Sequence, residues 1–307
     1  MPPLSIPPLI TSLIGFFGTQ GLPSSTAAVP SAPATCGLTF DGRIPQVATP
    51  KTFTTDKSPF NPKYVLGNNV TWDQVIEFPN ISQSRFDKQA NTKPVGLSLS
   101  DKSVFLSGSE GLETKLRRTE LLVNNRNDTV SGHVTWHLSL RTDPSRPLNY
   151  SHEYVLAFQE AQDYQADFWS LKVGAPLLSP LGTPPDKVVR LDGYKWDDPV
   201  KTFFQTPLTD DVWHNFGIGL DYDKNLISLL YSTNDDPLKL VVPATTNNLS
   251  GKAPTTLGET HFGLQKRPVG ANLENFLFNG SQPSGINEGF FFGGIFQDNS
   301  ANGCVTA

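Results

Sequence analysis

The sequence contains few cysteine, methionine and charged residues. Of its 307 residues 2 are cysteine and 1 is methionine, and charged side chains make up 17%. The net charge is −5, and neither sign forms a sustained run. Nucleic acids and anionic membranes attract concentrated positive charge, so neither is expected as a partner. A neutral polymer or a small molecule is the better candidate.

Several motifs that carry chemistry are also missing. The chain has no phosphate-cradling glycine loop, no Gly-X-Ser-X-Gly elbow and no Cys/His cluster with metal-ligand spacing. His152 and Glu153 begin like the zinc signature HEXXH, but Leu156 stands where the second histidine would be. No motif therefore identifies a cofactor or a metal, and none is expected.

What the chain has in quantity is turn-forming and aromatic residues. It contains 25 glycines, 26 prolines and 20 phenylalanines. This mixture is typical of an all-β protein, and all-β domains often reach this length as single units. We therefore expect one all-β domain over residues 36–307, most simply as a monomer.

The first 35 residues differ from the rest. An apolar stretch from Leu9 to Phe17 is followed by small residues around Ala27 and Ala28, which resembles a signal peptide. Residues 18–35 are rich in Ser, Thr, Ala, Pro and Gly, which is typical of a flexible leader. No other segment is apolar enough to cross a bilayer. The interpretation is a secreted, extracellular protein without a membrane partner.

The two cysteines, Cys36 and Cys304, lie near the ends of the predicted domain. They form either a disulfide, which requires an oxidising compartment, or two unpaired thiols. Glycosylation sequons agree with secretion and occur at Asn69, Asn80, Asn127, Asn149, Asn248 and Asn279.

The stretch from Ser151 to Asp163 predicts a strand with an unusual face. Strict alternation would place polar and apolar groups together on that face, namely His152, Tyr154, Leu156, Phe158 and Glu160. A carboxylate on such a surface must be paired, solvated in a cleft or shifted in protonation. The alternative is a His and a Glu at the solvated rims of a sheet.

Other segments also alternate. Residues 115–123 place Arg118, Glu120 and Leu122 on one face, where Glu120 is either a buried ion-pair partner or catalytic. Residues 132–141 turn His133, Thr135, His137, Ser139 and Arg141 toward solvent or a groove, and this strand is expected beside the one that follows. Residues 95–106 predict a hairpin, and residues 211–233 a second one in which His214 is either a core histidine or a site residue.

Several of these segments together resemble glycoside hydrolase family 131, the fungal secreted β-glucanases. The resemblance covers residues 36–304. Its motifs are F-D-G-R-I-P (40–45), S-P-F-N-P-K-Y-V-L-G (58–67), R-R-T-E-L-L (117–122), R-P-L-N-Y-S-H-E-Y (146–154), F-Q-E-A-Q-D-Y (158–164) and W-H-N-F (213–216).

The resemblance implies a β-jelly roll of two antiparallel sheets with an open concave cleft. It also implies hydrolysis of β-1,3, β-1,6 and β-1,4 glucan linkages with inversion, carried out by Glu120 and Glu160. His152 and His214 would line the cleft, and Arg117, Tyr154 and His137 are further substrate-binding candidates.

Glycoside hydrolysis needs one carboxylic acid and one carboxylate. Apolar neighbours favour Glu160 as the acid, and the arginines at 117 and 118 favour Glu120 as the base. One alternative is a glucan-binding lectin that stacks sugars on Trp136, Trp169, Trp196 or Trp213. Another is a polysaccharide lyase on the same fold.

Overall fold

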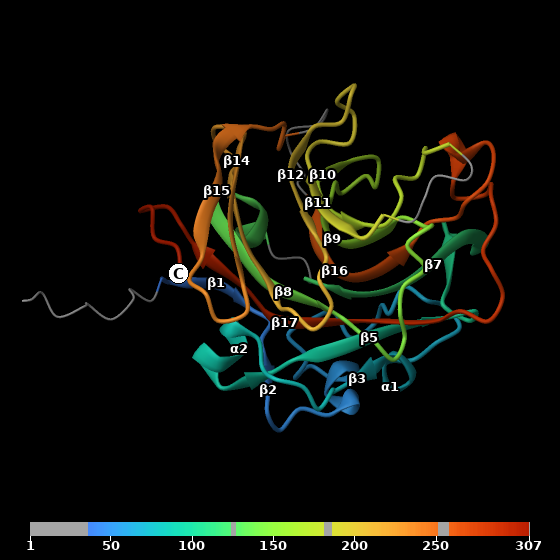
Figure 1. The fold of residues 1–307 in the computed structure, drawn as a ribbon, viewed down its shortest axis with the longest axis horizontal. Coiled ribbons are helices and arrows are strands. Elements are labelled where there is room, and N and C mark those ends of the chain that lie inside the picture. The colour runs from blue at the N-terminus through green and yellow to red at the C-terminus, as the bar shows by residue number, and fades with distance from the viewer. Residues whose placement is uncertain (1–35, 124–126, 181–185, 251–257, 307) are drawn as a thin grey trace, which may run out of the picture. The chain divides into compact units, whose positions relative to one another are not determined.

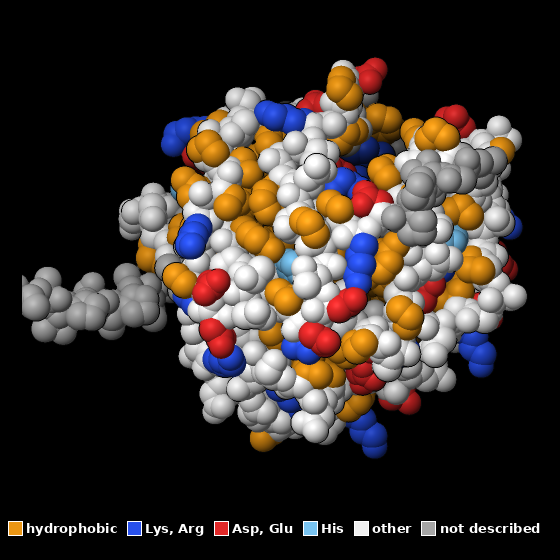
Figure 2. All heavy atoms as spheres, viewed as in Figure 1, with side chains coloured by type: hydrophobic (Ala, Val, Ile, Leu, Met, Phe, Trp, Pro, Cys, Tyr) orange, Lys and Arg blue, Asp and Glu red, His pale blue; other side chains and the backbone are white. Residues whose placement is uncertain are grey.

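Two antiparallel β-sheets packed face to face make up most of the molecule (Figure 1). On the face drawn in Figure 2, Lys and Arg side chains lie among Asp and Glu side chains, and neither sign gathers into a large patch. The computed structural model describes residues 36–123, 127–180, 186–250 and 258–306. The expected signal peptide and leader, residues 1–35, lie outside these ranges and stay a prediction. Among the helices of the described ranges, none has the length and apolar character that a membrane span needs.

One sheet has eight strands, and most of its neighbours come from distant parts of the chain. Its order is β15 (Lys239–Thr246), β14 (Leu226–Thr233), β13 (His214–Asp221), β8 (His133–Thr142), β17 (Asn287–Asn299), β5 (Val95–Ser100) and β3 (Ile76–Glu77), with β1 (Leu38–Asp41) also paired to β17. The carboxy-terminal strand β17 therefore lies in the interior of this sheet, between β8 and β5.

The other sheet has seven strands and carries the site described below. Its order is β12 (Thr202–Pro207), β11 (Val188–Asp192), β10 (Asp167–Val173), β9 (Tyr154–Glu160), β16 (Glu259–Lys266), β7 (Leu112–Leu122) and β6 (Val104–Ser107). Every strand pair in both sheets is antiparallel. The predicted all-β jelly roll of two antiparallel sheets is confirmed.

The remaining elements are short and lie outside the two main sheets. They are a small ladder of β2 (Ile44–Pro45) and β4 (Thr92–Lys93), the helices α1 (Trp72–Val75) and α2 (Arg85–Ala90), and the 3₁₀ helices η1 (Pro50–Thr54), η2 (Asn127–Val130) and η3 (Leu273–Asn275). Ser84 caps α2 by accepting the Asp87 N–H, which fixes where this helix begins. The helix then packs Phe86 against His137 of β8.

The core fills the space between the two sheets with the inward-facing side chains of each strand. Trp136 of β8 meets Phe262 of β16 edge to face, with ring centroids 5.1 Å apart. Thr119 of β7 donates a hydrogen bond across the core to the Ser98 carbonyl of β5 at 3.0 Å. Side chains that alternate with these on β7, β9 and β16 point to the outer face of the seven-stranded sheet.

Two predicted pairings are wrong, although the strands themselves are present. The strands β5 and β6 do not form a hairpin, because the chain crosses from one sheet to the other between them. For the same reason β8 and β9 belong to opposite sheets and are not neighbours. The hairpin of β13 and β14 is confirmed, with His214 paired to Thr233.

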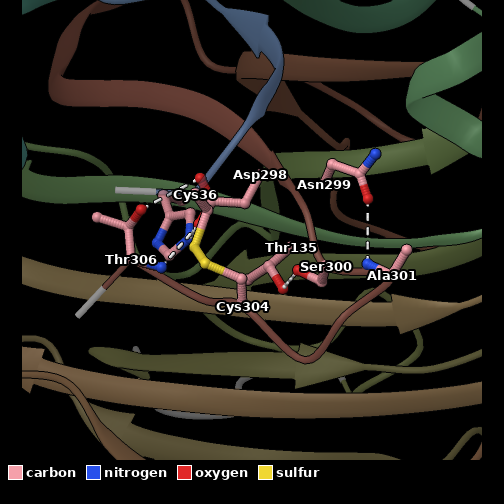
Figure 3. The surroundings of a disulfide bond; sticks show 9 residues. Cys36, Thr135, Asp298, Asn299, Ser300, Ala301, Cys304 and Thr306 are labelled. Carbon is pink, nitrogen blue, oxygen red and sulfur yellow. Dashed lines mark hydrogen bonds and ion pairs between the residues drawn. A yellow bond between two sulfur atoms is a disulfide. The ribbon is translucent and has the colours of Figure 1, made fainter. Parts of the chain in front are cut away.

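The expected disulfide joins Cys36 to Cys304, whose Cα atoms are 5.7 Å apart across a separation of 268 residues (Figure 3). Beside it, Asp298 accepts hydrogen bonds from the backbone and the hydroxyl of Thr306 (Figure 3). These contacts hold the chain end against β17. Of the sequon residues, Asn69, Asn80, Asn127 and Asn149 are exposed, and Asn248 and Asn279 are half-buried. Their glycosylation stays a prediction.

Candidate active site

A cleft of about 830 Å³ opens on the outer face of the seven-stranded sheet. Its floor is formed by alternate side chains of β7, β9 and β16. Its walls come from the loop 63–68, β6, the turn that carries Tyr164, Lys195 and the segment around Phe276. Four cleft-lining groups are acidic or can be protonated near neutrality, and these are Glu160, Asp167, Glu259 and His261.

The strand β7 contributes Arg118 and Glu120, as alternation predicted. Thr119 and Leu121 face the core, so Arg118 and Glu120 face the cleft side. The Arg118 guanidinium donates two hydrogen bonds to the Glu120 carboxylate, from Nε at 2.7 Å and from Nη2 at 2.8 Å. Glu120 is 1% exposed and lies beneath the cleft lining.

The strand β9 contributes Phe158 and Glu160, but not the whole face that strict alternation predicts. Across β10, Leu171 pairs with Ala157 and Lys172 with Val155, so Leu156 is an extra residue in a β-bulge. Leu156 and Ala157 both enter the core, and the pleat reverses at this point. Tyr154 therefore points between the sheets, while Glu160 points into the cleft.

The strand β16 contributes two residues that the sequence interpretation missed. Glu259 lies directly opposite Glu160 in the β16–β9 pair, and His261 lies opposite Phe158. The His261 ring stacks on Phe158 with centroids 4.5 Å apart. Gly258 precedes this segment with φ +66°, and a Cβ there would lie 1.7 Å from the Glu160 carbonyl oxygen. Only glycine allows this approach of β16 to β9.

His261 connects the buried ion pair to the cleft. Its Nδ1 lies 2.9 Å from Glu120 Oε2, and its Nε2 lies 3.6 Å from Glu160 Oε2 and 3.7 Å from Glu259 Oε1. Burial alone favours neutral Glu120, but Arg118 and then His261 hold the pKa of Glu120 at about 2. Since Glu120 is a carboxylate, Nδ1 of His261 must carry the hydrogen.

The pKa of His261 is raised as a result. Burial disfavours the imidazolium, but the hydrogen bond to Glu120 and the charges of Glu120 and Glu160 raise the pKa of His261 above 6.5. At mildly acidic pH the ring is a cation enclosed by three carboxyl groups. Arg118 is a second cation in the same cluster.

Glu160 and Glu259 have their pKa shifted in the opposite sense from Glu120. Burial raises the pKa of Glu160, and Asp167 and Glu120 add to this, against the lowering effect of His261 and Arg118. Burial also raises the pKa of Glu259, again opposed by His261. Their side chains are 18% and 24% exposed, so both can reach a molecule in the cleft. The site can hold one acid and one carboxylate side by side.

Of the predicted site residues, Glu160 lines the cleft and Glu120 lies directly below it. The five predicted substrate-binding residues lie elsewhere. His152 Nδ1 is 2.8 Å from the Arg267 carbonyl oxygen, and the Tyr154 hydroxyl donates to Glu288 between the sheets. Arg117 faces away from Arg118 and donates to the Leu116 carbonyl. Only Arg118, and not Arg117, supports the Glu120 carboxylate.

The other two histidines are buried in the eight-stranded sheet. His137 Nε2 lies 2.9 Å from Asp298, and its ring stacks on Phe296. His214 Nδ1 lies 2.7 Å from the Tyr231 hydroxyl. The polar face of β8 is therefore neither open to solvent nor a groove at His137, because Phe86 of α2 covers it. These positions favour the core interpretation over substrate contact.

The tryptophans proposed as lectin platforms are mostly inaccessible. Trp136, Trp169 and Trp213 are buried, and Trp196 alone of those four is exposed. A signal for Glu259 and His261 was present in the sequence E-T-H-F of residues 259–262, which places the two side chains on one face of a strand. What the sequence did not contain is the register that sets this face beside Glu160.

Glycoside hydrolases use a pair of acidic side chains in a substrate cleft, and this jelly roll places Glu160 and Glu259 in one. Residues 38–303 match the family described as glycoside hydrolase 131 catalytic N-terminal domain. The chain therefore belongs to glycoside hydrolase family 131.

Two solved structures resemble this fold over nearly their whole length. The GH131 β-glucanase catalytic domain from Podospora anserina is 19% identical with a TM-score of 0.66, covering 88% of this chain and 97% of its own. The catalytic domain of the family 131 protein from Coprinopsis cinerea is 18% identical with a TM-score of 0.62, covering 88% and 96%. At these identities the likeness concerns the fold. No curated protein sequence gives a significant match to the chain.

Proposed function

We propose that this glycoside hydrolase is a secreted β-glucanase that cleaves β-1,3, β-1,6 and β-1,4 linkages, with Glu160 as the proton donor. The observation that carries the proposal is the position of His261, whose Nε2 lies within 4 Å of both Glu160 and Glu259. The disulfide between Cys36 and Cys304 supports an oxidising, extracellular setting.

The charges around His261 determine how many protons Glu160 and Glu259 hold between them. Arg118 and His261 are two cations at mildly acidic pH, and Glu120 supplies one permanent negative charge. A second negative charge, shared between Glu160 and Glu259, balances these two cations, while the nearby Asp167 has its own cation in Arg267, whose Nη2 lies 3.8 Å from Asp167 Oδ2. Glu160 and Glu259 lie opposite each other on paired strands, and burial raises the pKa of both, so we infer that one of the two keeps its proton. This is the acid and carboxylate pair that glycoside hydrolysis needs.

Glu160 is the better acid of the two. Its side chain is less exposed than that of Glu259, it lies in a cleft lined by Phe158, and the charge of Asp167 raises its pKa further. Glu259 is the more solvated group and is suited to take a proton from water. In this scheme Glu160 protonates the leaving oxygen while Glu259 activates the attacking water.

Glu120 has a different role from the base that we expected from the sequence. Its oxygens accept hydrogen bonds from Arg118 and His261, and a pKa of about 2 makes it a weak base. We assign it as a positioning residue that fixes the tautomer and the orientation of His261. Its removal should act through His261 and not through the attacking water.

The anomeric configuration of the product tests the roles proposed for Glu160 and Glu259. Inversion, which the family resemblance implies, needs the two carboxyl groups roughly 6.5–9.5 Å apart, whereas retention needs about 5 Å. NMR of the newly released reducing end gives the anomer directly. A β product from a β-glucan would mean retention, in which case Glu259 would act as a nucleophile and not as a base.

The experiment that tests the function is reducing-sugar release from β-1,3, β-1,6 and β-1,4 glucans, compared among the parent protein, Glu160→Gln and Glu259→Gln. We expect each variant to lose roughly 100- to 10,000-fold in kcat. The matched control is Glu113→Gln, since Glu113 is exposed on the same strand as Glu120 and lies outside the cleft lining. Thermal melting confirms that each variant is folded.

The alternatives give different results. Glucan binding without sugar release by the parent protein would reject hydrolysis in favour of a lectin. Products with ultraviolet absorbance from a carbon–carbon double bond would indicate a lyase. Full activity of Glu160→Gln would remove this residue from the reaction.

A further inference from the structure

Two exposed tyrosines stand on separate loops of the cleft. Tyr164 is 69% exposed and Tyr64 is 54% exposed, and both line the cleft that contains Glu160. Large aromatic rings left open to water inside a binding cleft lose the free energy that burial would give them. A ring kept in this position needs a reason other than packing.

The backbone at Tyr164 adopts an unusual left-handed conformation, with φ +60°. Among the described residues, the non-glycine positions with positive φ are Leu66, Asn91, Tyr164, Asp211, Asn225, Asn234 and Asn272. Asn and Asp tolerate this left-handed region, whereas a bulky side chain there is a genuine outlier. The two bulky exceptions are Leu66 and Tyr164, and both line the cleft. Local strain of this kind concentrates at functional sites.

The turn that holds Tyr164 is fixed from both sides. The Tyr164 N–H donates to the Ala161 carbonyl at 2.9 Å, and the Ala161 N–H donates to the Ala166 carbonyl at 2.8 Å. The Trp196 Nε1–H donates to the Gln165 carbonyl at 2.8 Å and anchors the turn to the next loop. Tyr164 is four residues after Glu160 on the same segment. The backbone that carries the Tyr164 ring is therefore held at the cleft wall, close in sequence to the proton donor.

We propose that Tyr164 is a stacking platform for a glucose unit of the substrate next to the bond that is cleaved, an inference that rests on the proposed function. A β-linked glucose ring has two broad faces of C–H groups, which pack on the face of an aromatic ring, while its hydroxyls stay solvated. An exposed ring at the wall of an acidic cleft suits such a ligand. Tyr64, on the loop 63–68 of the same cleft, is available to a second sugar unit.

The test measures binding separately from catalysis. Dissociation constants for β-1,3- and β-1,4-linked gluco-oligosaccharides of increasing length are determined by calorimetry in the Glu160→Gln background, where the ligand is not consumed. Tyr164→Gly is the informative variant, because glycine adopts φ +60° without strain. Tyr164→Phe keeps the ring, and Leu240→Ala is a control on β15 of similar exposure, 62% against 69%, outside the cleft lining.

We expect Tyr164→Gly to bind the longer oligosaccharides roughly tenfold more weakly and to melt no lower than its parent. Tyr164→Phe and Leu240→Ala should bind as the parent does. Unchanged affinity in Tyr164→Gly would overturn the platform, and so would a lower melting temperature with a proportional loss for every ligand length, since the ring would then be structural.

Parallel hydrolysis assays separate the two proposals. If the unmodified protein hydrolyses glucan but Tyr164→Gly binds normally, the platform fails and the proposed function stands. If the protein hydrolyses no glucan, yet binding depends on the Tyr164 ring, the function fails and the platform stands. If it neither hydrolyses nor binds these glucans, both proposals fail.

Discussion

Gly263 lies directly opposite Glu120 in the antiparallel pair of β16 and β7. A Cβ at Gly263 would lie 2.3 Å from the Thr119 carbonyl oxygen and 2.7 Å from the Glu120 Cα. Both are backbone atoms, which cannot move aside without displacing the strand. The absence of a side chain at Gly263 therefore lets β16 bring His261 within hydrogen-bonding distance of Glu120.

Gly263→Ala should consequently lower both stability and activity. The strand has to shift to relieve the contact, which we expect to cost about 1–3 kcal/mol of unfolding free energy and to lengthen the distance from His261 Nδ1 to Glu120. Chemical denaturation and kcat on a soluble β-glucan measure the two effects. Gly217→Ala is the control, because a Cβ at this strand glycine would meet only side-chain atoms, at 3.3 Å or more. Equal changes of unfolding free energy and kcat in Gly263→Ala and Gly217→Ala would contradict this role of Gly263.

The pH dependence of activity should follow the raised pKa of Glu160. The reaction needs protonated Glu160, so kcat/KM should fall as pH rises through a pKa above the ordinary value of 4.5. Burial is the main cause of this raised pKa, and Asp167 contributes to it. Asp167→Asn should therefore move the alkaline limb of the profile to lower pH. An alkaline limb that stays at the same pH in Asp167→Asn, or moves to higher pH, would exclude Glu160 as the group that titrates.

The stability of the protein should depend on Glu120 at low pH. The pKa of Glu120 is about 2 in the folded protein, against 4.5 for an ordinary glutamate. A lowered pKa stabilises the fold above pH 4.5, and this contribution, roughly 3 kcal/mol, is lost as pH falls from 4.5 through 2. Urea denaturation at a series of pH values, compared with Glu120→Gln, isolates it.

At pH 6 we expect Glu120→Gln to be less stable by about 3–5 kcal/mol, because it leaves the Arg118 and His261 cations buried without their partner. The difference from the parent should shrink on acidification, as Glu120 becomes neutral in the parent as well. A difference that is constant from pH 6 to pH 2 would mean that the loss is one of packing and not of charge.

The sequence predicted the layers of this fold better than their connections. Alternation on β7 correctly separated Arg118 and Glu120 from Thr119 and Leu121, because that segment keeps an unbroken pleat. It failed on β9, where the extra residue Leu156 reverses the faces, and a bulge leaves no mark in apolar periodicity. Neighbouring segments were also expected to pair, but β5 and β6 belong to different sheets.

Only part of the site could be predicted from the sequence. Glu120 and Glu160 stood out because a carboxylate among apolar residues is unusual, whereas Glu259 and His261 depend on the register of β16 against two other strands. The histidines at 137, 152 and 214 were conspicuous for the same reason as the glutamates. Their partners, Asp298, the Arg267 carbonyl and Tyr231, lie 161, 115 and 17 residues away, and such long-range pairing cannot be derived from local pattern.

The disulfide should matter for stability and not for the reaction. It closes a loop of 268 residues, so its removal frees the unfolded chain, and we expect the double variant Cys36→Ser, Cys304→Ser to lose about 2–5 kcal/mol of unfolding free energy. The cleft residues lie on the other sheet, and β1 remains paired to β17 without the bond. At 25 °C kcat should therefore equal that of the parent, while the denaturation midpoint falls. A folded double variant with lost activity would indicate that the bond supports the cleft after all.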